Sequence, residues 1–496
     1  MTSMEIYMPQ SKFEPKIVNA EYKTHLDDDL NRNPLTEAIH IMLKYDEIRA
    51  RLFEQPPIQD NFWDLPGFYK KTQLNALTRY HVANDYCPFL YHKFCELMLC
   101  HYQYRDPFSV EQVRLKTMLS ESARDKTYLQ PTIRLAGVTT APSSLLHGPS
   151  GSGKSTTIRN SLSLIPQVII HESFKGKPYK SRQITWLSFD CPATASPKAL
   201  ALSFFAAIDS ALSKTDKPSR YAKEWEGRER VGVEHLYGMM QSLAAQYNIG
   251  LVHIDELQFF LSYINSPKSP NLQIIESLFN KIGIPVFLSS TTEGLTLFDP
   301  IETEPGQIPD FTIVRRLIDD REYELKPLKH GTKNFNDTFD LFFRPEICID
   351  GAVPTEEFKT QFHYLTAGLQ SAIARLARLH LETVIMLNNK CDVGKPKIST
   401  GDISVLNSVY QKQFHRMDYA LSFLREGDVI KFDQHCPKTD DGKIDFESKP
   451  EKSNSTNKSI KKVSKKAPKI SGSGKASKNR NKPSRSIKTG FGANDE

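Results

Sequence analysis

One octapeptide in the chain has the residue types and the spacing of a phosphate-binding loop. Residues 148–155 read Gly-Pro-Ser-Gly-Ser-Gly-Lys-Ser and fit the pattern G-x-x-x-x-G-K-[ST] at every position. In such a loop, glycines let backbone N–H groups turn toward a phosphate, the lysine reaches the β- and γ-phosphate oxygens, and the last hydroxyl ligates Mg²⁺. The pattern therefore predicts a site for ATP and Mg²⁺. The residues expected to hold the nucleotide are Gly148, Pro149, Ser150, Gly151, Ser152, Gly153, Lys154, Ser155 and Thr156.

Two adjacent carboxylates follow further along the chain. Asp255 and Glu256 come directly after the apolar run at residues 251–254. We expect Asp255 to ligate Mg²⁺ together with Ser155, and Glu256 to polarise the water that attacks the γ-phosphate. Two acids at a buried strand end would be costly without a cation to neutralise them. The pair favours a hydrolytic ATPase, and the alternative is a solvated helix start.

Four more residues are candidates for contacts with the transferred phosphoryl group. Thr291, with Ser290 as second choice, follows an apolar run and is expected to orient the lytic water. Arg315 and Arg316 are expected to contact the nucleotide of a neighbouring subunit and to stabilise the charge that develops on its transferred phosphate. The alternative is a surface pair that bridges nearby acids. Arg375 could return to the nucleotide from a helical segment, or it could be an ordinary arginine on a helix face.

These side chains need a framework to position them. Short apolar runs alternate with helical patterns from about residue 130 onward, which indicates an α/β fold with a parallel sheet and covering helices. Near-continuous apolar runs are typical of strands inside a parallel sheet. A helix expected at residues 154–164 offers its N-terminus to the phosphates. The expected strands are residues 143–148, 168–174, 183–190, 250–255 and 284–290, with a last one at 323–328.

The chain of 496 residues is too long for one compact core, and we divide it into four segments. Residues 1–129 are expected to be a mostly α-helical interaction region, in which nothing suggests chemistry. Residues 130–345 are expected to form the P-loop ATPase core. Residues 346–430 read as a small helical lid with further C-terminal helices. Residues 431–496 read as a disordered basic tail.

The charge of the chain is concentrated at its C-terminal end. Residues 449–496 contain 14 Lys/Arg and 3 Asp/Glu, a net charge of +11, so the overall charge of +7 leaves −4 for the first 448 residues. The tail has too few apolar side chains to offset the entropy of ordering it. We expect it to contact phosphate backbones or an acidic partner, and a merely solubilising tail is the alternative.

Composition excludes some classes of protein. No apolar run reaches the length of a membrane span, and the N-terminal residues lack a signal-peptide pattern. Seven scattered cysteines fit a reducing compartment. We therefore expect a cytoplasmic protein with no membrane partner.

The combined motifs resemble AAA+ ATPases and, among them, the TnsC/TniB regulators of heteromeric DNA transposons. The finer resemblance is carried by Gln-Ile-Thr-Trp-Leu-Ser-Phe-Asp-Cys-Pro at 183–192, by the helix end at 204–209, by Val-His-Ile-Asp-Glu-Leu-Gln at 252–258 and by Val-Arg-Arg at 314–316. It covers roughly residues 130–390. The family implies an ATP-dependent homo-oligomer, a ring or filament, that wraps duplex DNA without sequence preference and links a target-selector protein to the transposase subunits. It also implies a place in the bacterial cytoplasm in association with the nucleoid.

A basic segment is the candidate DNA contact in this interpretation. Lys175, Lys177, Lys180 and Arg182 lie in what reads as a turn between two strands, and such a loop can point into the pore of a ring. A solvated hairpin is the alternative. Two other functions also stay open: an AAA+ replication initiator or loader ATPase, and a nucleotide-switched signalling scaffold whose partners are proteins only.

Overall fold

The structure is a computed structural model, and the description below covers the residues that it defines. These are residues 16–40, 43–124, 143–192, 196–226, 232–259, 284–298, 321–390, 397–438 and 444.

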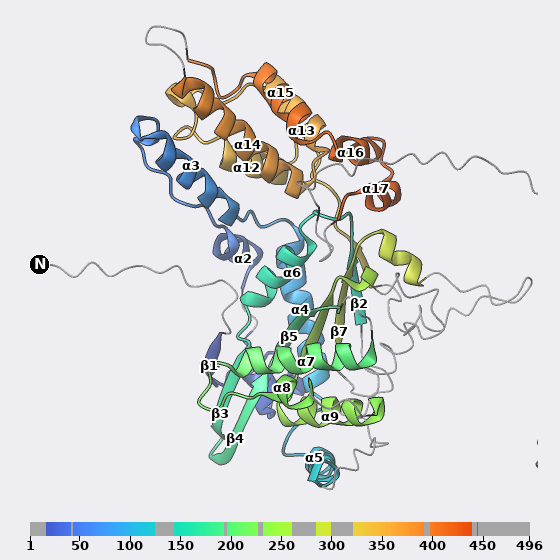
Figure 1. The fold of residues 1–496 in the computed structure, drawn as a ribbon. Helices are drawn as coiled ribbons and strands as arrows, with labels where there is room; N and C mark the ends of the chain where they lie inside the picture. The colour runs from blue at the N-terminus through green and yellow to red at the C-terminus, as the bar shows by residue number, and fades with distance from the viewer. Residues whose placement is uncertain are drawn as a thin grey trace, which may run out of the picture. The chain divides into compact units, whose positions relative to one another are not determined.

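A five-stranded parallel sheet with the order β5-β6-β7-β2-β8 forms the centre (Figure 1). Every residue of β2, β6 and β7 is buried, which explains why these strands read as apolar runs. Asp190 lies opposite Asp255, and His147 lies opposite Ser290, so the carboxyl ends of four strands meet at one edge. The strands are β2 Ser143–His147, β5 Trp186–Asp190, β6 Leu251–Asp255, β7 Val286–Ser290 and β8 Glu322–Glu324.

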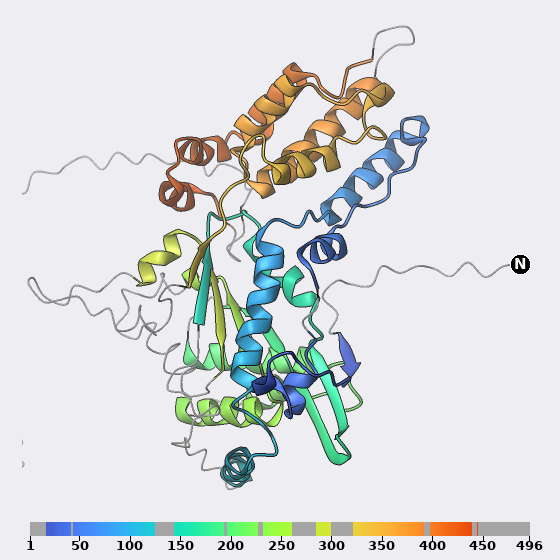
Figure 2. The same cartoon turned by 180° about the vertical axis from the view of Figure 1, so that it is seen from behind.

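Helices cover both faces of this sheet. Successive strand residues point to opposite faces, so Leu145 joins one apolar cluster and Leu146 another. Helices α5, α7, α8 and α9 contribute to the first cluster, and α4 and α6 to the second; Figure 2 shows the fold from behind. In the second cluster, Phe94 of α4 packs edge-on against Phe287. The helices are α4 Tyr86–Tyr102, α5 Val110–Arg124, α6 Lys154–Ser163, α7 Pro197–Leu212, α8 Tyr221–Glu226 and α9 Val233–Gln246.

The N-terminal segment is part of this core rather than an appendage. Strand β1 pairs with β3, which pairs with β4, in a second, three-stranded sheet. Tyr102 of α4 donates a hydrogen bond to the carbonyl of Asn248 at 2.6 Å, just before β6. The predicted helical character of residues 1–129 is confirmed where the chain is described. The elements are β1 Ile17–Asn19, α1 Pro34–Glu37, α2 Tyr45–Leu52, α3 Gly67–Ala76, β3 Val168–Phe174 and β4 Lys177–Ile184, with short 3₁₀ helices η1 Asp28–Leu30, η2 Phe62–Asp64 and η3 Leu77–Arg79.

The prediction of a basic turn over residues 175–182 is wrong. Only Lys175 and Gly176 form the turn, with φ values of 46° and 80°, and β4 begins at Lys177. Two consecutive residues with positive φ make the tight two-residue turn whose twist suits a hairpin. The lysines that hid this strand from sequence reasoning belong to a largely exposed strand at the edge of its sheet, where charged side chains discourage further pairing.

The C-terminal helices pack around an aromatic core that includes Phe335, Phe339, Phe358 and Phe362. The helical pattern over residues 355–387 is broken by Ala367 and Gly368, both with positive φ. A Cβ at Gly368 would lie 2.0 Å from the Leu328 carbonyl oxygen, so the break needs glycine. The helices are α12 Lys333–Phe342, α13 Glu356–Thr366, α14 Gln370–Asn389, α15 Ile403–Gln413, α16 Met417–Arg425 and α17 Val429–His435, with 3₁₀ helices η5 Glu293–Phe298 and η6 Ile349–Gly351.

The predicted start of the tail at residue 431 falls inside α17 and needs correction. This helix is capped by Asp428, which accepts a hydrogen bond from the Lys431 N–H, and it buries Phe432 and Asp433. The remainder of the predicted tail, apart from residues 436–438 and 444, lies outside the described residues. None of the described helices is long and apolar enough to cross a bilayer.

Candidate functional site

The phosphate-binding loop connects β2 to α6 at the edge where the strand ends meet. Gly151 and Gly153 have φ values of 76° and 92°, a backbone conformation that L side chains rarely adopt. Gly153 is the N-cap of α6, so the first turn of that helix faces the loop. A Cβ at Gly153 would also lie 2.1 Å from Oε1 of Gln370, the first residue of α14. The loop therefore has the expected form, and a helix of the C-terminal segment touches it.

The ammonium of Lys154 is turned back onto its own loop. Its Nζ donates to the carbonyl oxygens of Gly148 at 2.9 Å and Pro149 at 3.0 Å. Burial lowers the pKa of Lys154, and the carboxylates of Asp433, Glu256 and Asp255 oppose this shift. Three carboxylates therefore act on one buried cation, and two of them are the pair that the sequence singled out.

The Asp255 carboxylate is fixed by hydrogen bonds in an environment that favours its charged form. Its carboxylate accepts hydrogen bonds from the hydroxyls of Ser155 and Ser289, and Oδ2 lies 3.5 Å from a guanidinium nitrogen of Arg159. Burial would raise the pKa of Asp255, but His253 and the two hydroxyls outweigh it, so the pKa lies below its ordinary value. An ionised carboxylate in contact with the loop hydroxyl is the donor set that Mg²⁺ prefers, so these residues fit a magnesium ion.

The pKa of Glu256 is shifted in the opposite direction from that of Asp255. Burial and the adjacent Asp255 raise the pKa of Glu256 to about 7, although Lys154 opposes the shift. Its backbone has a φ of 58°, which is uncommon for a residue with a side chain. The side-chain amide of Gln258 donates to the Glu256 carboxylate. A carboxylate with a pKa near neutrality suits a general base.

Gln258 also connects Glu256 to the end of β7. Its Oε1 accepts from the Thr291 N–H at 3.1 Å and from the Ser290 hydroxyl at 3.3 Å. Thr291 is buried and lines the same cavity as Glu256, whereas Ser289 contacts Asp255. The structure therefore brings Thr291 to the cavity with Lys154, Ser155 and Glu256.

A cavity of 450 Å³ opens beside the loop. One wall consists of loop residues with Glu256 and Thr291, and another comes from Tyr80, His81 and Asn84, which precede α4. Sequence reasoning assigned no chemistry to this N-terminal stretch, because it carries no motif.

Two other residues were missed as well. Arg159, four residues after Ser155 on α6, joins the ends of β5 and β6 by contacting Asp190 and Asp255. The i, i+4 spacing from the loop serine could have indicated it, because residues four apart share a helix face. Asp433 reaches the loop from α17, 283 residues away from Ser150, and no pattern in the sequence links the two.

Of the three arginines predicted to contact the nucleotide, the structure describes only Arg375. Arg315 and Arg316 lie outside the described residues. Arg375 is on α14, but among the described residues the cavity is lined by its neighbours Gln370, Ser371 and Ala374 instead.

The four cations of the β3–β4 hairpin do not act as one group. Lys175 donates to the buried carboxylate of Glu37 at 2.6 Å, and the ammonium of Lys177 lies 5.6 Å from the centre of the Phe108 ring. Lys180 and Arg182 instead line a cavity of 660 Å³.

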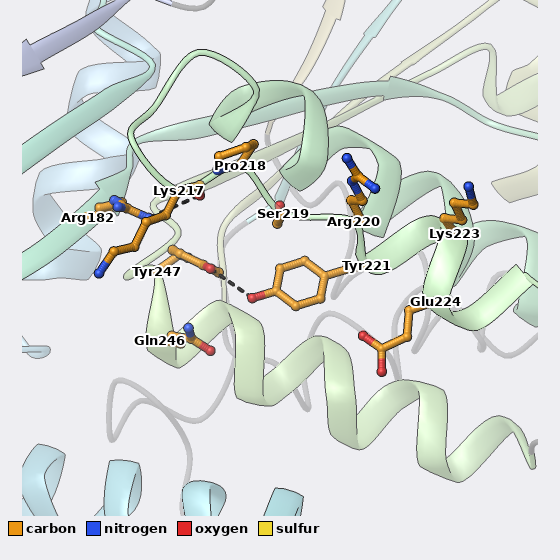
Figure 3. A pocket seen from close by; sticks show the side chains of 10 residues that line it. All are labelled: Arg182, Lys217, Pro218, Ser219, Arg220, Tyr221, Lys223, Glu224, Gln246 and Tyr247. Carbon is orange, nitrogen blue, oxygen red and sulfur yellow. Dashed lines mark hydrogen bonds between the residues drawn. The ribbon is translucent and has the colours of Figure 1, made fainter.

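A second cavity, of 620 Å³, adjoins that one and shares Arg182 with it (Figure 3). The guanidinium of Arg182 donates to the Lys217 carbonyl and pairs with Asp216. Figure 3 shows a hydrogen bond of 2.8 Å between the hydroxyls of Tyr221 and Tyr247, which both line this cavity. We call this the basic surface; its cations are Lys180, Arg182, Lys214, Lys217, Arg220 and Lys223.

Comparison with known proteins identifies the domain that carries the site. Residues 138–298 match the family model of the AAA domain, and this segment holds the loop, Asp255, Glu256 and Thr291. Residues 138–298 are therefore an AAA-type P-loop domain. No curated protein matches the sequence.

Several solved structures are similar over part of the chain. One is a Walker-type ATPase of Pyrococcus abyssi, with 13% identity, a TM-score of 0.34 and coverage of 60% of this chain and 78% of that one. The Thermotoga maritima RuvB Holliday junction branch migration motor has 11% identity, a TM-score of 0.28 and coverage of 64% and 76%. The Drosophila origin recognition complex bound to DNA has 10% identity, a TM-score of 0.26 and coverage of 64% and 70%.

Proposed function

We propose that this protein binds ATP with Mg²⁺ and hydrolyses it to ADP and phosphate. One observation carries the proposal: Lys154, the Ser155–Asp255 contact and Glu256 converge beside a single cavity. The loop N–H groups and Lys154 bind the β- and γ-phosphates, and Ser155 and Asp255 hold the magnesium ion. The ion supplies charge neutralisation on the phosphate oxygens when bound.

The remaining steps of hydrolysis belong to groups of the protein. Glu256 accepts a proton from the attacking water, and Gln258 fixes its carboxylate. Thr291 orients that water from the end of β7. Tyr80 and His81 form another wall of the same cavity.

We further propose that ATP controls assembly of this protein on duplex DNA and that the assembly links a target selector to a transposase, at the nucleoid. Support comes from the resemblance of the residues around Asp255 and Trp186 to TnsC/TniB regulators. Arg315 or Arg316 would then complete the ATP site of a neighbouring subunit. A nucleotide shared in this way makes assembly depend on ATP, and assembly multiplies weak phosphate contacts.

The basic surface supplies the phosphate contacts in this proposal. It extends the predicted DNA site of the hairpin. Lys180 and Arg182 pair with the exposed acids Glu172 and Asp216 and share their cavities with the cations of the α7–α8 connection, whereas Lys175 contacts the buried Glu37. Phosphate contacts carry no base information, so binding should be independent of sequence.

The test measures ATP turnover with and without duplex DNA. The wild-type protein should hydrolyse ATP slowly and faster with DNA, and Lys154→Ala should abolish nucleotide binding. Hydrolysis that DNA leaves unchanged, with no DNA binding, would favour a protein-only scaffold. DNA stimulation without any effect on a co-expressed transposase would favour a replication loader.

Replacing Arg315 and Arg316 together by Ala tests the shared site. The monomer should still bind ATP, while ATP-dependent assembly and turnover should fall together, as seen by electron microscopy with a slowly hydrolysed ATP analogue and DNA. Normal rings or filaments with normal turnover would remove both arginines from the site.

A further inference from the structure

A carboxylate from the C-terminal helix α17 contacts the phosphate-binding loop at the border of the proposed nucleotide site. Asp433 is completely buried, although it belongs to neither the loop nor the strands. Its Oδ1 accepts a hydrogen bond from the Ser150 N–H of the phosphate-binding loop at 2.8 Å. Its Oδ2 accepts from the N–H groups of Thr292 at 3.0 Å and Glu293 at 3.4 Å, directly after β7. The Asp433 carboxylate therefore bridges the phosphate-binding loop and the residues after β7 by hydrogen bonds.

In the proposed ATP complex these two elements would flank the γ-phosphate, because Lys154 of the loop and Thr291 at the end of β7 line the same cavity. Asp433 is the carboxylate that acts most strongly on Lys154, ahead of Glu256 and Asp255. A negative charge in this position attracts the lysine that ATP needs and repels the γ-phosphate. ADP has no γ-phosphate and would meet much less of this repulsion.

Two described residues after α17, Lys438 and Ile444, add contacts near the loop and the end of β7. Lys438 pairs with Glu293 at 3.2 Å and forms a β-bridge with Ile444. Ile444 lines the nucleotide cavity, and a Cβ at Gly151 would lie 2.6 Å from its Cδ1. Ile444, beyond the end of α17, therefore contacts the loop in addition to Asp433.

We propose that Asp433 is a specificity-determining residue that distinguishes ATP from ADP: the γ-phosphate displaces its carboxylate from the Ser150 N–H and releases α17. The proposal rests on the proposed ATP binding and adds the means by which the protein registers the γ-phosphate. In the ADP state Asp433 stays on the loop and α17 stays docked.

The first test compares affinities for ATPγS and ADP in the presence of Mg²⁺. Asp433→Asn keeps the size of the side chain but removes the charge, so the ratio of ATPγS affinity to ADP affinity should rise about tenfold. Asp428→Asn is the matched control, because Asp428 caps the same helix without contacting the loop, and it should keep the wild-type ratio. An unchanged ratio in folded Asp433→Asn, or an equal loss for both nucleotides, would overturn the proposal.

The second test needs no variant. Cys436 ends α17 and is buried, so its alkylation by N-ethylmaleimide, followed by peptide mass spectrometry, reports release of the helix. ATPγS should speed the reaction of Cys436 several-fold over ADP, while the buried Cys95 of α4 stays protected in both states. If both nucleotides bind and leave Cys436 equally protected, this inference fails alone. If neither binds, the proposed ATPase fails with it.

Discussion

Two neighbouring carboxylates in this protein have opposite electrostatic environments. His253 and hydroxyl donors keep the pKa of Asp255 below its ordinary value, whereas burial and the charge of Asp255 raise the pKa of Glu256. Environments that push two pKa values apart assign different roles to chemically similar groups. Asp255 therefore suits the permanently charged metal ligand, and Glu256 suits the group that takes and releases a proton.

The assignment of Glu256 predicts a pH dependence. Its pKa of about 7 means that the carboxylate is charged above neutrality and protonated below it, so the rate of single-turnover ATP hydrolysis should fall as the pH drops through about 7. Glu256→Gln should still bind ATP, lose about a hundredfold or more in rate and keep the assembled state on DNA. Wild-type turnover by this variant would show that another group is the base.

The Gln258 amide predicts a positioning effect that can be separated from folding. Its hydrogen bond favours the charged form of Glu256, so Gln258→Ala should lower kcat about tenfold and move the pH inflection upward, with the affinity for ATP unchanged. Gln411→Ala, at an exposed position of α15, is the control. A lower kcat with an unmoved inflection would leave Gln258 a purely structural role.

At the scale of elements, the sequence was most informative where burial is uniform. Strands β2, β6 and β7 are buried along their whole length, so each appears as an apolar run whose bounds the structure reproduces closely. Strand β4 escaped detection because it is a charged edge strand, and its outer residues need no partner across the sheet. Such a strand has the composition of a loop.

In the site, residues within contiguous motifs could be predicted from the sequence, whereas a residue brought in from a distant segment could not. The loop and the Asp255–Glu256 pair are contiguous motifs, so their places could be predicted. Asp433 could not, because its contact with Ser150 joins residues 283 positions apart through the docking of α17. A pattern within a short stretch of sequence does not predict a contact between a helix and a distant loop.

The basic surface predicts a measurable change in DNA affinity. Replacing Lys217, Arg220 and Lys223 by Glu should weaken binding to duplex DNA about equally for all sequences. The slope of affinity against salt should also fall by about one for every phosphate that the protein no longer neutralises. ATP turnover without DNA should not change. Glu at the three exposed lid residues Lys390, Lys397 and Lys412 is the matched control, and an equal weakening there would mean that only net charge matters.

At the scale of the whole chain, the excess positive charge and the candidate residues for ATP chemistry lie in different segments. The first 448 residues carry a net charge of −4 and contain every candidate for ATP chemistry, whereas the last 48 carry +11 and none of them. The boundary matters for experiments, because α17 and Ile444 contact the phosphate-binding loop. A truncation placed at residue 431 would remove Asp433 and would confuse loss of the tail with damage to the site.

Deletion of residues 449–496 avoids that problem and tests the tail. We expect ATP turnover and ATP-driven assembly to stay near normal, because the catalytic candidates and the α17 contact remain, while transposition in a cell assay falls sharply. The terminal residues 489–496 contain Phe491 and two acidic residues but neither Lys nor Arg. A segment that only tethered DNA would not require an aromatic ring or acidic side chains. We therefore expect them to dock a transposase subunit while the lysines hold nearby DNA. Removing only 489–496 separates the two roles, and full transposition from this short truncation would leave the electrostatic tether as the sole role of the tail.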